Sequence, residues 1–553
     1  MNLRDITKRT AAAFLDWRAV TLAPLETPVF RILWVSAFVF NFGAVIQSVG
    51  AAWMMTTLAA SELMVSLVQA ATLAPFLLLS LPAGALADSA DRRVILMVAQ
   101  FGGCLVAGVL AVLAWFNAVS PWILLAATAM IGAVTAIQQP AWHASVGDIV
   151  TRERLPAAVG LNSLAFNLAR STGPALGGLI VAISGPFVAF AFNAVASLGT
   201  GIVMATQKLP SPPRTAPPEP LHAAIATGLR YVAMAPALKA TLLRSTLLGL
   251  GGGAIWSLPP LIVHHRLEAG PVAYGLLLAG FGTGSVVGAL LSMRLQIRLG
   301  APRQVQMALA ALAVATGGIA LSESVLLSVL FMTVGGFGWN AAMTTLTSAI
   351  QLASPRWVVG RAVALSRLCT FGGLALGSVL CGVTGEFSNV MIACGLSALI
   401  LLAGLLLPGI HLLPDRTSPD LTPVGRTPRP PAATLSPNSG PITFLIEYRC
   451  APADIPELQA ALLPLRPLRL RNGARNWSMS QDIDDPALWI ERFDVATWND
   501  YVRGITRGTV ADEPTMERAR TFRVAGPVRR LLKRPSGALP VVEENPPDGS
   551  DAS

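Results

Sequence analysis

Residues 160–178 read GLNSLAFNLARSTGPALGG. They lie in a long apolar stretch, yet they include an arginine, a proline and four glycines. A charge at the centre of a membrane span costs about 2.5–3.5 kcal/mol even on the lenient insertion scale, and proline removes a backbone hydrogen bond. Glycines let two membrane helices approach closely. The stretch therefore predicts a bent, tightly packed membrane helix whose arginine faces a cavity or a partner helix.

The composition supports a membrane protein. Of the 553 residues, 53% are hydrophobic and 13% are charged, whereas soluble domains carry about 25% charged residues. The net charge of +10 would suit nucleic acid, but basic cytoplasmic loops explain it better, so no nucleic-acid partner is expected. The spacing of the five cysteines predicts neither a metal site nor a disulfide framework. No motif in the sequence predicts a cofactor.

Apolar runs of about 20 residues, the length that spans a bilayer, recur along the chain. Cutting at charges and turn residues predicts twelve transmembrane helices in two six-helix halves. The first half is expected at 29–58, 62–86, 94–116, 121–143, 157–183 and 185–206. The second half is expected at 237–262, 272–294, 303–321, 325–350, 361–384 and 388–411.

The predicted fold is an all-α membrane protein with a small C-terminal α+β ferredoxin-like domain. Residues 441–525 follow the order β-α-β-β-α, which is typical of that domain, and proline-rich residues 412–440 precede it as a linker. The predicted organisation is a cytoplasmic N-terminal segment at 1–28, the two transmembrane halves at 29–206 and 237–411, a central cytoplasmic loop at 207–236, and a disordered tail at 526–553.

Basic residues fix the predicted orientation. The loops after every second span carry arginines and lysines, and those on the other side carry almost none, with Arg266 the clear exception. By the positive-inside rule, both termini are cytoplasmic in a multi-pass protein of the cytoplasmic (inner) membrane. The two halves also match at an offset of 200 residues, as in Gly173 and Gly373. Such a duplication is typical of transporters and predicts a substrate site between the halves.

Residues 84–93, GALADSADRR, resemble the loop motif of the major facilitator superfamily, although Ser89 replaces an arginine and Asp91 replaces a glycine. The resemblance implies that Asp88 belongs to a conformational latch. Its carboxylate is expected to meet the N-terminus of the helix that begins near Gly360, where the helix dipole favours an anion. The alternative is an ordinary charged turn. The predicted latch residues are Gly84, Asp88, Arg92 and Arg93.

The opening stretch resembles the fifth-span motif of superfamily antiporters, with Ala169 in place of one glycine. The predicted antiporter seam consists of Gly160, Gly173, Pro174, Gly177 and Gly178. Residues 28–411 are most similar to the exporter branch that includes enterobactin and macrolide exporters. This resemblance implies export of drug-like or siderophore-like small molecules by proton antiport. The alternatives are uptake by the same fold, and a seam whose glycines serve only packing.

Residues 489–512, WIERFDVATWNDYVRGITRGTVAD, resemble the antibiotic-biosynthesis-monooxygenase-like domain. Tyr501 and Ile505 stand where that domain would be expected to have histidines, so self-association or regulation is expected rather than catalysis. A membrane-tethered oxidoreductase is the alternative, and its chemistry would lie in this domain.

Polar side chains within the spans are candidates for the substrate cavity, although any single one can instead join helices. The candidates are Asn41, Gln138, Gln139, Asn167, Arg170, Asn193, Asn340 and Arg367. Protons are the expected coupling ion, but no aspartate or glutamate lies deep in a predicted span to carry them.

Overall fold

The computed structural model describes residues 22–533 except 59–60, 90, 152–153, 208–228, 356–357, 408–412, 414–419, 422–423, 425–435, 437–438 and 523–528. For some residues in helices and strands, Asp88 among them, only the backbone is described. The chain forms two compact units. The first comprises Met1–Leu221, Pro236–Gln351 and Arg361–Arg416, and the second comprises His222–Ala235, Leu352–Gly360 and Thr417–Ser553.

The first six predicted spans coincide with helices. After a 3-10 turn at Ala23–Glu26 come α2 (Pro28–Leu58), α3 (Glu62–Ser89), α4 (Arg92–Trp115), α5 (Pro121–Ile149), α6 (Leu155–Ser184) and α7 (Pro186–Thr206). Three of these helices begin at proline, which lacks the N–H that a first turn leaves unpaired anyway. Asp91 accepts a hydrogen bond from the backbone N–H of Arg93 and so caps α4.

The second half contains α9 (Pro236–Ser257), α10 (Pro259–Leu261), a π-helical turn at Ile262–Arg266, α11 (Pro271–Leu321), α12 (Val325–Leu352), α13 (Val359–Phe387) and α14 (Val390–Leu406). Helix α11 covers two predicted spans, and its backbone breaks at Gly300, where φ is 77°. By length and composition, nine of the described helices suit a membrane crossing, and α14 is shorter than these. The count of twelve crossings therefore stays a prediction.

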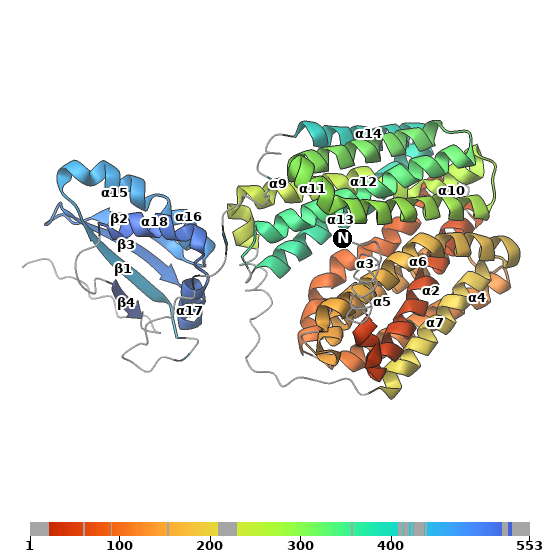
Figure 1. The fold of residues 1–553 in the computed structure, drawn as a ribbon, viewed down its shortest axis with the longest axis horizontal. Coiled ribbons are helices and arrows are strands. Elements are labelled where there is room, and N and C mark those ends of the chain that lie inside the picture. Colours follow the sequence, from red (N-terminus) through yellow and green to blue (C-terminus); the bar gives the residue numbers. More distant parts are fainter. Residues whose placement is uncertain are drawn as a thin grey trace, which may run out of the picture. The chain divides into compact units, whose positions relative to one another are not determined.

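Helices α2–α7 and α9–α14 form two groups within the first unit (Figure 1). Helices α4, α6, α9 and α13 all begin at the end of this bundle where the arginines gather, which we call the basic end. Its described basic residues include Arg92, Arg93, Arg154, Lys239, Arg298, Arg303 and Arg361.

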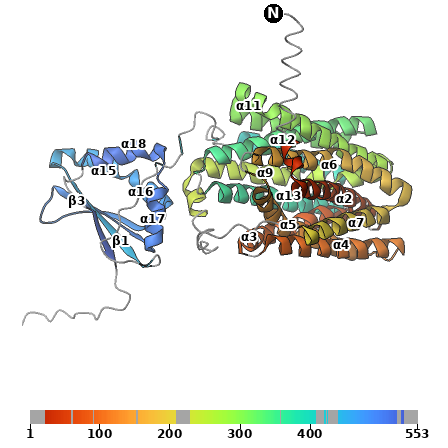
Figure 2. The same cartoon turned by 60° about the horizontal axis from the view of Figure 1, so that its bottom comes forward.

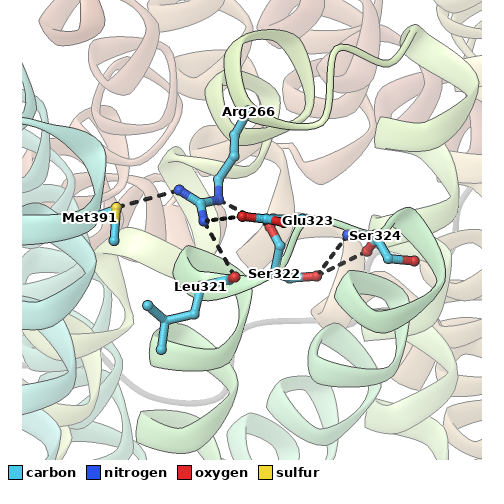
Figure 3. A network of polar contacts seen from close by, with 6 residues as sticks. All are labelled: Arg266, Leu321, Ser322, Glu323, Ser324 and Met391. Carbon is cyan, nitrogen blue, oxygen red and sulfur yellow. Dashed lines mark hydrogen bonds and ion pairs between the residues drawn. The ribbon is translucent and has the colours of Figure 1, made fainter.

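Arg266 lies at the other end of the bundle, which we call the opposite end, and its contacts explain why a cation is tolerated there (Figure 3). Its guanidinium donates to the carbonyl oxygens of Leu321 and Ser322 and lies 3.8 Å from the carboxylate of Glu323. Carbonyls at a helix C-terminus carry partial negative charge. Arg266 thus caps the end of α11 and joins it to the segment that follows α9.

The second unit contains a four-stranded antiparallel sheet with the order β2-β3-β1-β4. Its elements are β1 (Ile442–Arg449), α15 (Ile455–Leu462), α16 (Leu465–Arg471), β2 (Arg475–Gln481), β3 (Leu488–Val495), α17 (Trp498–Thr506), α18 (Glu513–Arg520) and β4 (Arg529–Lys533), with short 3-10 turns at Pro452–Asp454 and Val510–Asp512. Helices α15 and α18 lie along one side of the sheet (Figure 2). This order of elements is ferredoxin-like, and β4 lies beyond the predicted boundary at residue 525.

Tyr501 belongs to the hydrophobic core of this domain. Its ring lies 5.0 Å from that of Phe444, which in turn stacks on Phe493 at 4.6 Å. Only 2% of Tyr501 is exposed. The residue that stands in place of an expected histidine therefore packs between the sheet and α17.

A short piece of the central loop belongs to the same unit as the α+β domain. The guanidinium of Arg471 lies 5.5 Å from the ring centroid of Tyr231 and donates to both carboxylate oxygens of Asp512 at 2.7 Å. Tyr231 is only 2% exposed. The structure thus adds residues 229–235 to the domain, whereas the sequence places them in a separate loop.

Candidate substrate cavity between the two halves

The five residues of the predicted seam all lie in α6: Gly160, Gly173, Pro174, Gly177 and Gly178. Two of them face α2 of the same half. A Cβ atom at Gly173 would lie 3.0 Å from Cγ1 of Val45, and one at Gly177 would lie 3.2 Å from Cβ of Val49. The absence of side chains at these glycines lets α6 pack closely against α2.

Gly178 faces the other half of the bundle. A Cβ atom here would lie 2.5 Å from the carbonyl oxygen of Pro271 and 3.0 Å from Cα of Gly275, both in α11. One turn earlier, the carbonyl oxygen of Pro174 would lie 2.6 Å from a Cβ atom at Gly275. A third close approach places Gly282 against Ser171. The backbones of α6 and α11 therefore touch along two turns.

Further contacts join the halves at the opposite end. The carboxylate of Glu386 in α13 accepts hydrogen bonds from the Ser61 hydroxyl at 2.8 Å and the Leu63 N–H at 3.3 Å. The ring of Trp53 in α2 stacks on Tyr274 of α11 at 6.3 Å. The two halves are thus in contact at this end at three places.

The basic end is less tightly packed at the corresponding positions. Gly160 lies near the start of α6 and Gly360 near the start of α13, and a Cβ atom at either would have no neighbour within 4 Å outside its own helix. Gly160 therefore does not share the tight packing of the other seam glycines.

The four residues of the predicted latch lie at the basic end, in α3 and α4: Gly84, Asp88, Arg92 and Arg93. Arg93 donates to the carbonyl oxygens of Met204 and Ala205, and so ties the start of α4 to the end of α7. The side chain of Asp88 lies outside the described residues, so its contact with α13 stays a prediction.

Two of the predicted cavity residues join helices within the first half. Asn193 donates to the side-chain oxygen of Gln47, which links α7 to α2. Gln138 accepts a hydrogen bond from Gln100 at 2.8 Å, which links α5 to α4. All four amides are buried. The structure thus favours helix packing over substrate contact for Asn193 and Gln138.

The other six candidates keep accessible surface. They are Asn41, Gln139, Asn167, Arg170, Asn340 and Arg367. Asn167 donates to the carbonyl of Ser163 at 2.8 Å, and Asn340 accepts from Thr344 at 3.1 Å. Because these bonds stay within one helix, the remaining polar atoms of both amides stay available to a substrate.

Arg170 lies halfway along the 30-residue helix α6. Its guanidinium carbon is 4.9 Å from the ring centroid of Trp256 in α9 and 5.8 Å from that of Phe166. Trp256 packs in turn against Phe281 at 5.0 Å and Trp339 at 5.6 Å. Arg170 therefore reaches from the first half onto an aromatic cluster of the second half, where cation–π attraction stabilises it.

Arg367 lies about two turns into α13, on the other half from Arg170. Among the described residues, no ion pair or hydrogen bond is formed by either guanidinium. The two predicted cavity residues lie on helices of different halves.

Comparison with known proteins identifies the family of this chain. The sequence pattern of the transmembrane secretion effector family, within the major facilitator superfamily, matches residues 19–534. The chain belongs to this family. Its members are transporters rather than enzymes, and the chain is a multi-pass membrane protein.

Relatives in the family include siderophore transporters. The enterobactin exporter of Citrobacter koseri is 27% identical over 337 residues, which cover 59% of this chain and 77% of the exporter. The staphyloferrin A transporter of Staphylococcus aureus is 30% identical over 149 residues, which cover 27% of this chain and 38% of that transporter.

Solved structures share the fold of the membrane unit. A bacterial homologue of the lysosomal transporter Spinster covers 70% of this chain and 94% of its own, with a TM-score of 0.53 at 15% identity. The POT family transporter PepTSo covers 70% and 97%, with a TM-score of 0.57 at 12% identity. At these identities the match concerns the fold alone.

Sequence reasoning alone missed the partners of the seam and of Arg170. Gly275 and Gly282 are seven residues apart in α11, as are Ser171 and Gly178 in α6, and this shared spacing could have suggested the pairing. No comparable signal in the sequence places Trp256 beside Arg170, because the two residues lie on helices of different halves.

Proposed function

We propose that this member of the transmembrane secretion effector family exports small amphipathic molecules, of siderophore or drug type, across the cytoplasmic membrane by proton antiport. In this proposal the basic end and both termini face the cytoplasm. The placement of Arg170 carries the proposal: among the residues that the structure describes it forms no ion pair, and a cation beside an aromatic cluster suits a ligand that is aromatic or anionic and partly apolar. The names of the two siderophore-transporting relatives support the same class of substrate.

Transport requires that the two ends open in turn. In the proposed cycle, the contact of α6 with α11 seals the opposite end while substrate enters from the basic end. The seam then separates, and the latch around Asp88 closes the basic end. The close packing of α6 against α11 at glycines suits opening and closing, because closely packed surfaces separate as units rather than deform.

We also propose that the α+β domain serves self-association or regulation, which the resemblance of residues 489–512 to the antibiotic-biosynthesis-monooxygenase-like domain supports. Oxidoreductase activity is set aside, because the family consists of transporters rather than enzymes.

The test is secretion by a host that lacks its own siderophore exporters and drug pumps. The expected result is that the intact chain raises the siderophore concentration in the medium and lowers it in the cells, and that a proton uncoupler abolishes both effects. Export that persists with the uncoupler would contradict proton antiport. Accumulation inside the cells would favour uptake instead.

A further inference from the structure

Glu386, near the end of α13, binds the N-terminus of α3 in the other half of the bundle. Its carboxylate accepts one hydrogen bond from the hydroxyl of Ser61 at 2.8 Å and another from the N–H of Leu63 at 3.3 Å. Ser61 in turn accepts from the N–H of Met64 at 3.4 Å and so caps α3. The first N–H groups of a helix have no partner within the helix and carry partial positive charge. Glu386 therefore places an anion where α3 favours one.

Two glycines of α13 bring the two helices close enough for this contact. A Cβ atom at Gly382 would lie 2.8 Å from Cβ of Ser66 and 3.1 Å from Cα of Leu63. A Cβ atom at Gly385 would collide with the carboxylate of Glu62. Glycines allow such close approach of membrane helices. The carboxylate contact is thus part of a closely packed crossing between the first and the second half.

Glu62 brings a second carboxylate to the same junction. It stands between the two residues of α3 that bind Glu386, and its own carboxylate rests against Gly385, the residue before Glu386. Its buried Oε2 atom has no hydrogen-bond partner among the residues that the structure describes. Like charges repel each other more strongly where little water separates them. The junction therefore combines an attraction between the halves with a repulsion that limits its strength.

We propose that Glu386 and the N-terminus of α3 form a charge latch that holds the opposite end closed, and that Glu62 weakens this latch enough for it to open in each cycle. The latch predicted at the basic end has the converse arrangement, because there Asp88 near the end of α3 is expected to meet the start of α13. Rocking of the halves closes one end as it opens the other, so the two latches hold alternate states. The inference rests on the proposed function in that the membrane unit is taken to open at its two ends in turn.

The latch is tested through the reactivity of a single cysteine at the crossing. Ser66→Cys is introduced into a chain whose five native cysteines are replaced, and its reaction with a water-soluble maleimide is timed on the purified protein. Ser66 is 0% exposed and faces Gly382 of α13, so the rate of reaction follows the fraction of carriers that are open at this end. Glu386→Gln should raise the rate by about fivefold, because a neutral amide loses the favourable charge at the helix N-terminus.

Glu323→Gln is the matched control. Glu323 is also an exposed glutamate of the opposite end, but its ion pair with Arg266 stays within the second half, so the rate should equal that of the parent. Glu62→Gln should lower the rate because it removes the repulsion, and it should have no effect once Glu386→Gln is present. An unchanged rate in Glu386→Gln, or equal effects of Glu386→Gln and Glu323→Gln, would overturn the latch. A faster reaction in Glu62→Gln would overturn the proposed repulsion.

The alternation of the two latches is tested with Asp88→Asn. Loss of the latch at the basic end should favour carriers that are closed at the opposite end, so this variant should react more slowly, and Asp88→Asn combined with Glu386→Gln should react at an intermediate rate. A double variant that reacts like Glu386→Gln alone would overturn the alternation. These rates do not require transport. A chain that shows all the expected rates but exports nothing would refute the proposed function, whereas normal export with unchanged rates would refute the latch.

Discussion

Gly178 of α6 and Gly275 of α11 approach each other so closely that a Cβ atom added to either would lie 3.0 Å from the Cα atom of the other. Real Cβ atoms rarely approach a neighbour this closely, and both close neighbours are backbone atoms that cannot rotate away. The contact joins the two halves of the bundle. It makes this end of α6 a place where the packing of the two halves is sensitive to added volume.

Gly178→Val should weaken the closed arrangement of the opposite end. Overpacking costs about 1–3 kcal/mol, which shifts the equilibrium between the closed and open arrangements by about 5–150-fold. Export should therefore fall, and a pair of cysteines placed across this end should cross-link less. Gly160→Val is the matched control, because its Cβ has no neighbour within 4 Å and transport should stay normal. Normal export by Gly178→Val would show that the two helices can separate without cost.

Asp88→Asn should leave the chain folded and in the membrane but reduce transport severely, because a charge at a junction that forms and breaks in each cycle is lost. Asp91→Asn is the control. Asparagine also caps helices well, so the hydrogen bond from the N–H of Arg93 should persist and transport should continue. The measurement is export at equal amounts of membrane protein. Equal transport by both variants would refute the latch.

The helices were largely predictable from the sequence because membrane spans are set by local features. Apolar length defines each span, and prolines such as Pro121, Pro186 and Pro271 mark where three helices begin. Gly300 was harder to interpret. It lies between the predicted spans 272–294 and 303–321, yet the helix continues on both sides of it with only one residue at positive φ.

The contacts between helices were less predictable, because residue type alone does not say which neighbour a side chain meets. Asn193 and Asn167 have the same amide group in membrane spans, but Asn193 binds Gln47 on another helix while Asn167 bonds within its own. The sequence predicts that Arg170 faces a cavity or a partner helix, and in the structure its guanidinium lies over the ring of Trp256 in α9. The contact with the Trp256 ring depends on how the two halves pack against each other. The sequence pattern carries no information about that packing.

The stability of the α+β domain should depend on pH through Glu491. Burial alone would raise the pKa of Glu491, but the charge of Arg469 and hydrogen bonds from Arg469, Trp477 and Tyr448 hold it below its ordinary value of 4.5. A lowered pKa stabilises the fold above about pH 4.5, and this stability is lost as the pH falls through the folded-state value.

This prediction is checked by urea unfolding of residues 439–534, followed by tryptophan fluorescence between pH 7 and pH 3. Glu491→Gln should reduce the pH dependence in the acid range, because its side chain does not titrate. Arg469→Met should lower the free energy of unfolding at pH 7 by about 3–5 kcal/mol, since it leaves a fully buried carboxylate without its partner. A domain with the same acid sensitivity after Glu491→Gln would contradict this account.

Truncation after residue 415 should leave a carrier that still inserts into the membrane, because each of the two compact units has its own core. The truncation also removes Arg471 and uncovers Tyr231, whose pKa burial raises to about 12 in the intact chain. Arg471→Ala is the milder comparison, because it keeps the domain and removes one side chain, which lies over the Tyr231 ring and pairs with Asp512. The measurement is the yield of monodisperse protein from membranes. Complete loss of insertion on truncation would show that the two units fold together.

The last prediction separates two roles for Arg170. One role is structural, in which the guanidinium only packs on Trp256 and Phe166; the other is binding of an anionic substrate. Arg170→Lys keeps the charge but loses the planar fork, and Arg170→Gln keeps some hydrogen bonding without charge. If Arg170 binds an anion, Lys should retain more transport of anionic substrates than Gln, while transport of neutral substrates should hardly change in either variant. The measurement is export of matched anionic and neutral compounds at equal protein levels. Equal losses for both classes, together with poor membrane expression, would instead assign Arg170 to the packing of the two halves, because a packing defect does not distinguish the charge of the substrate.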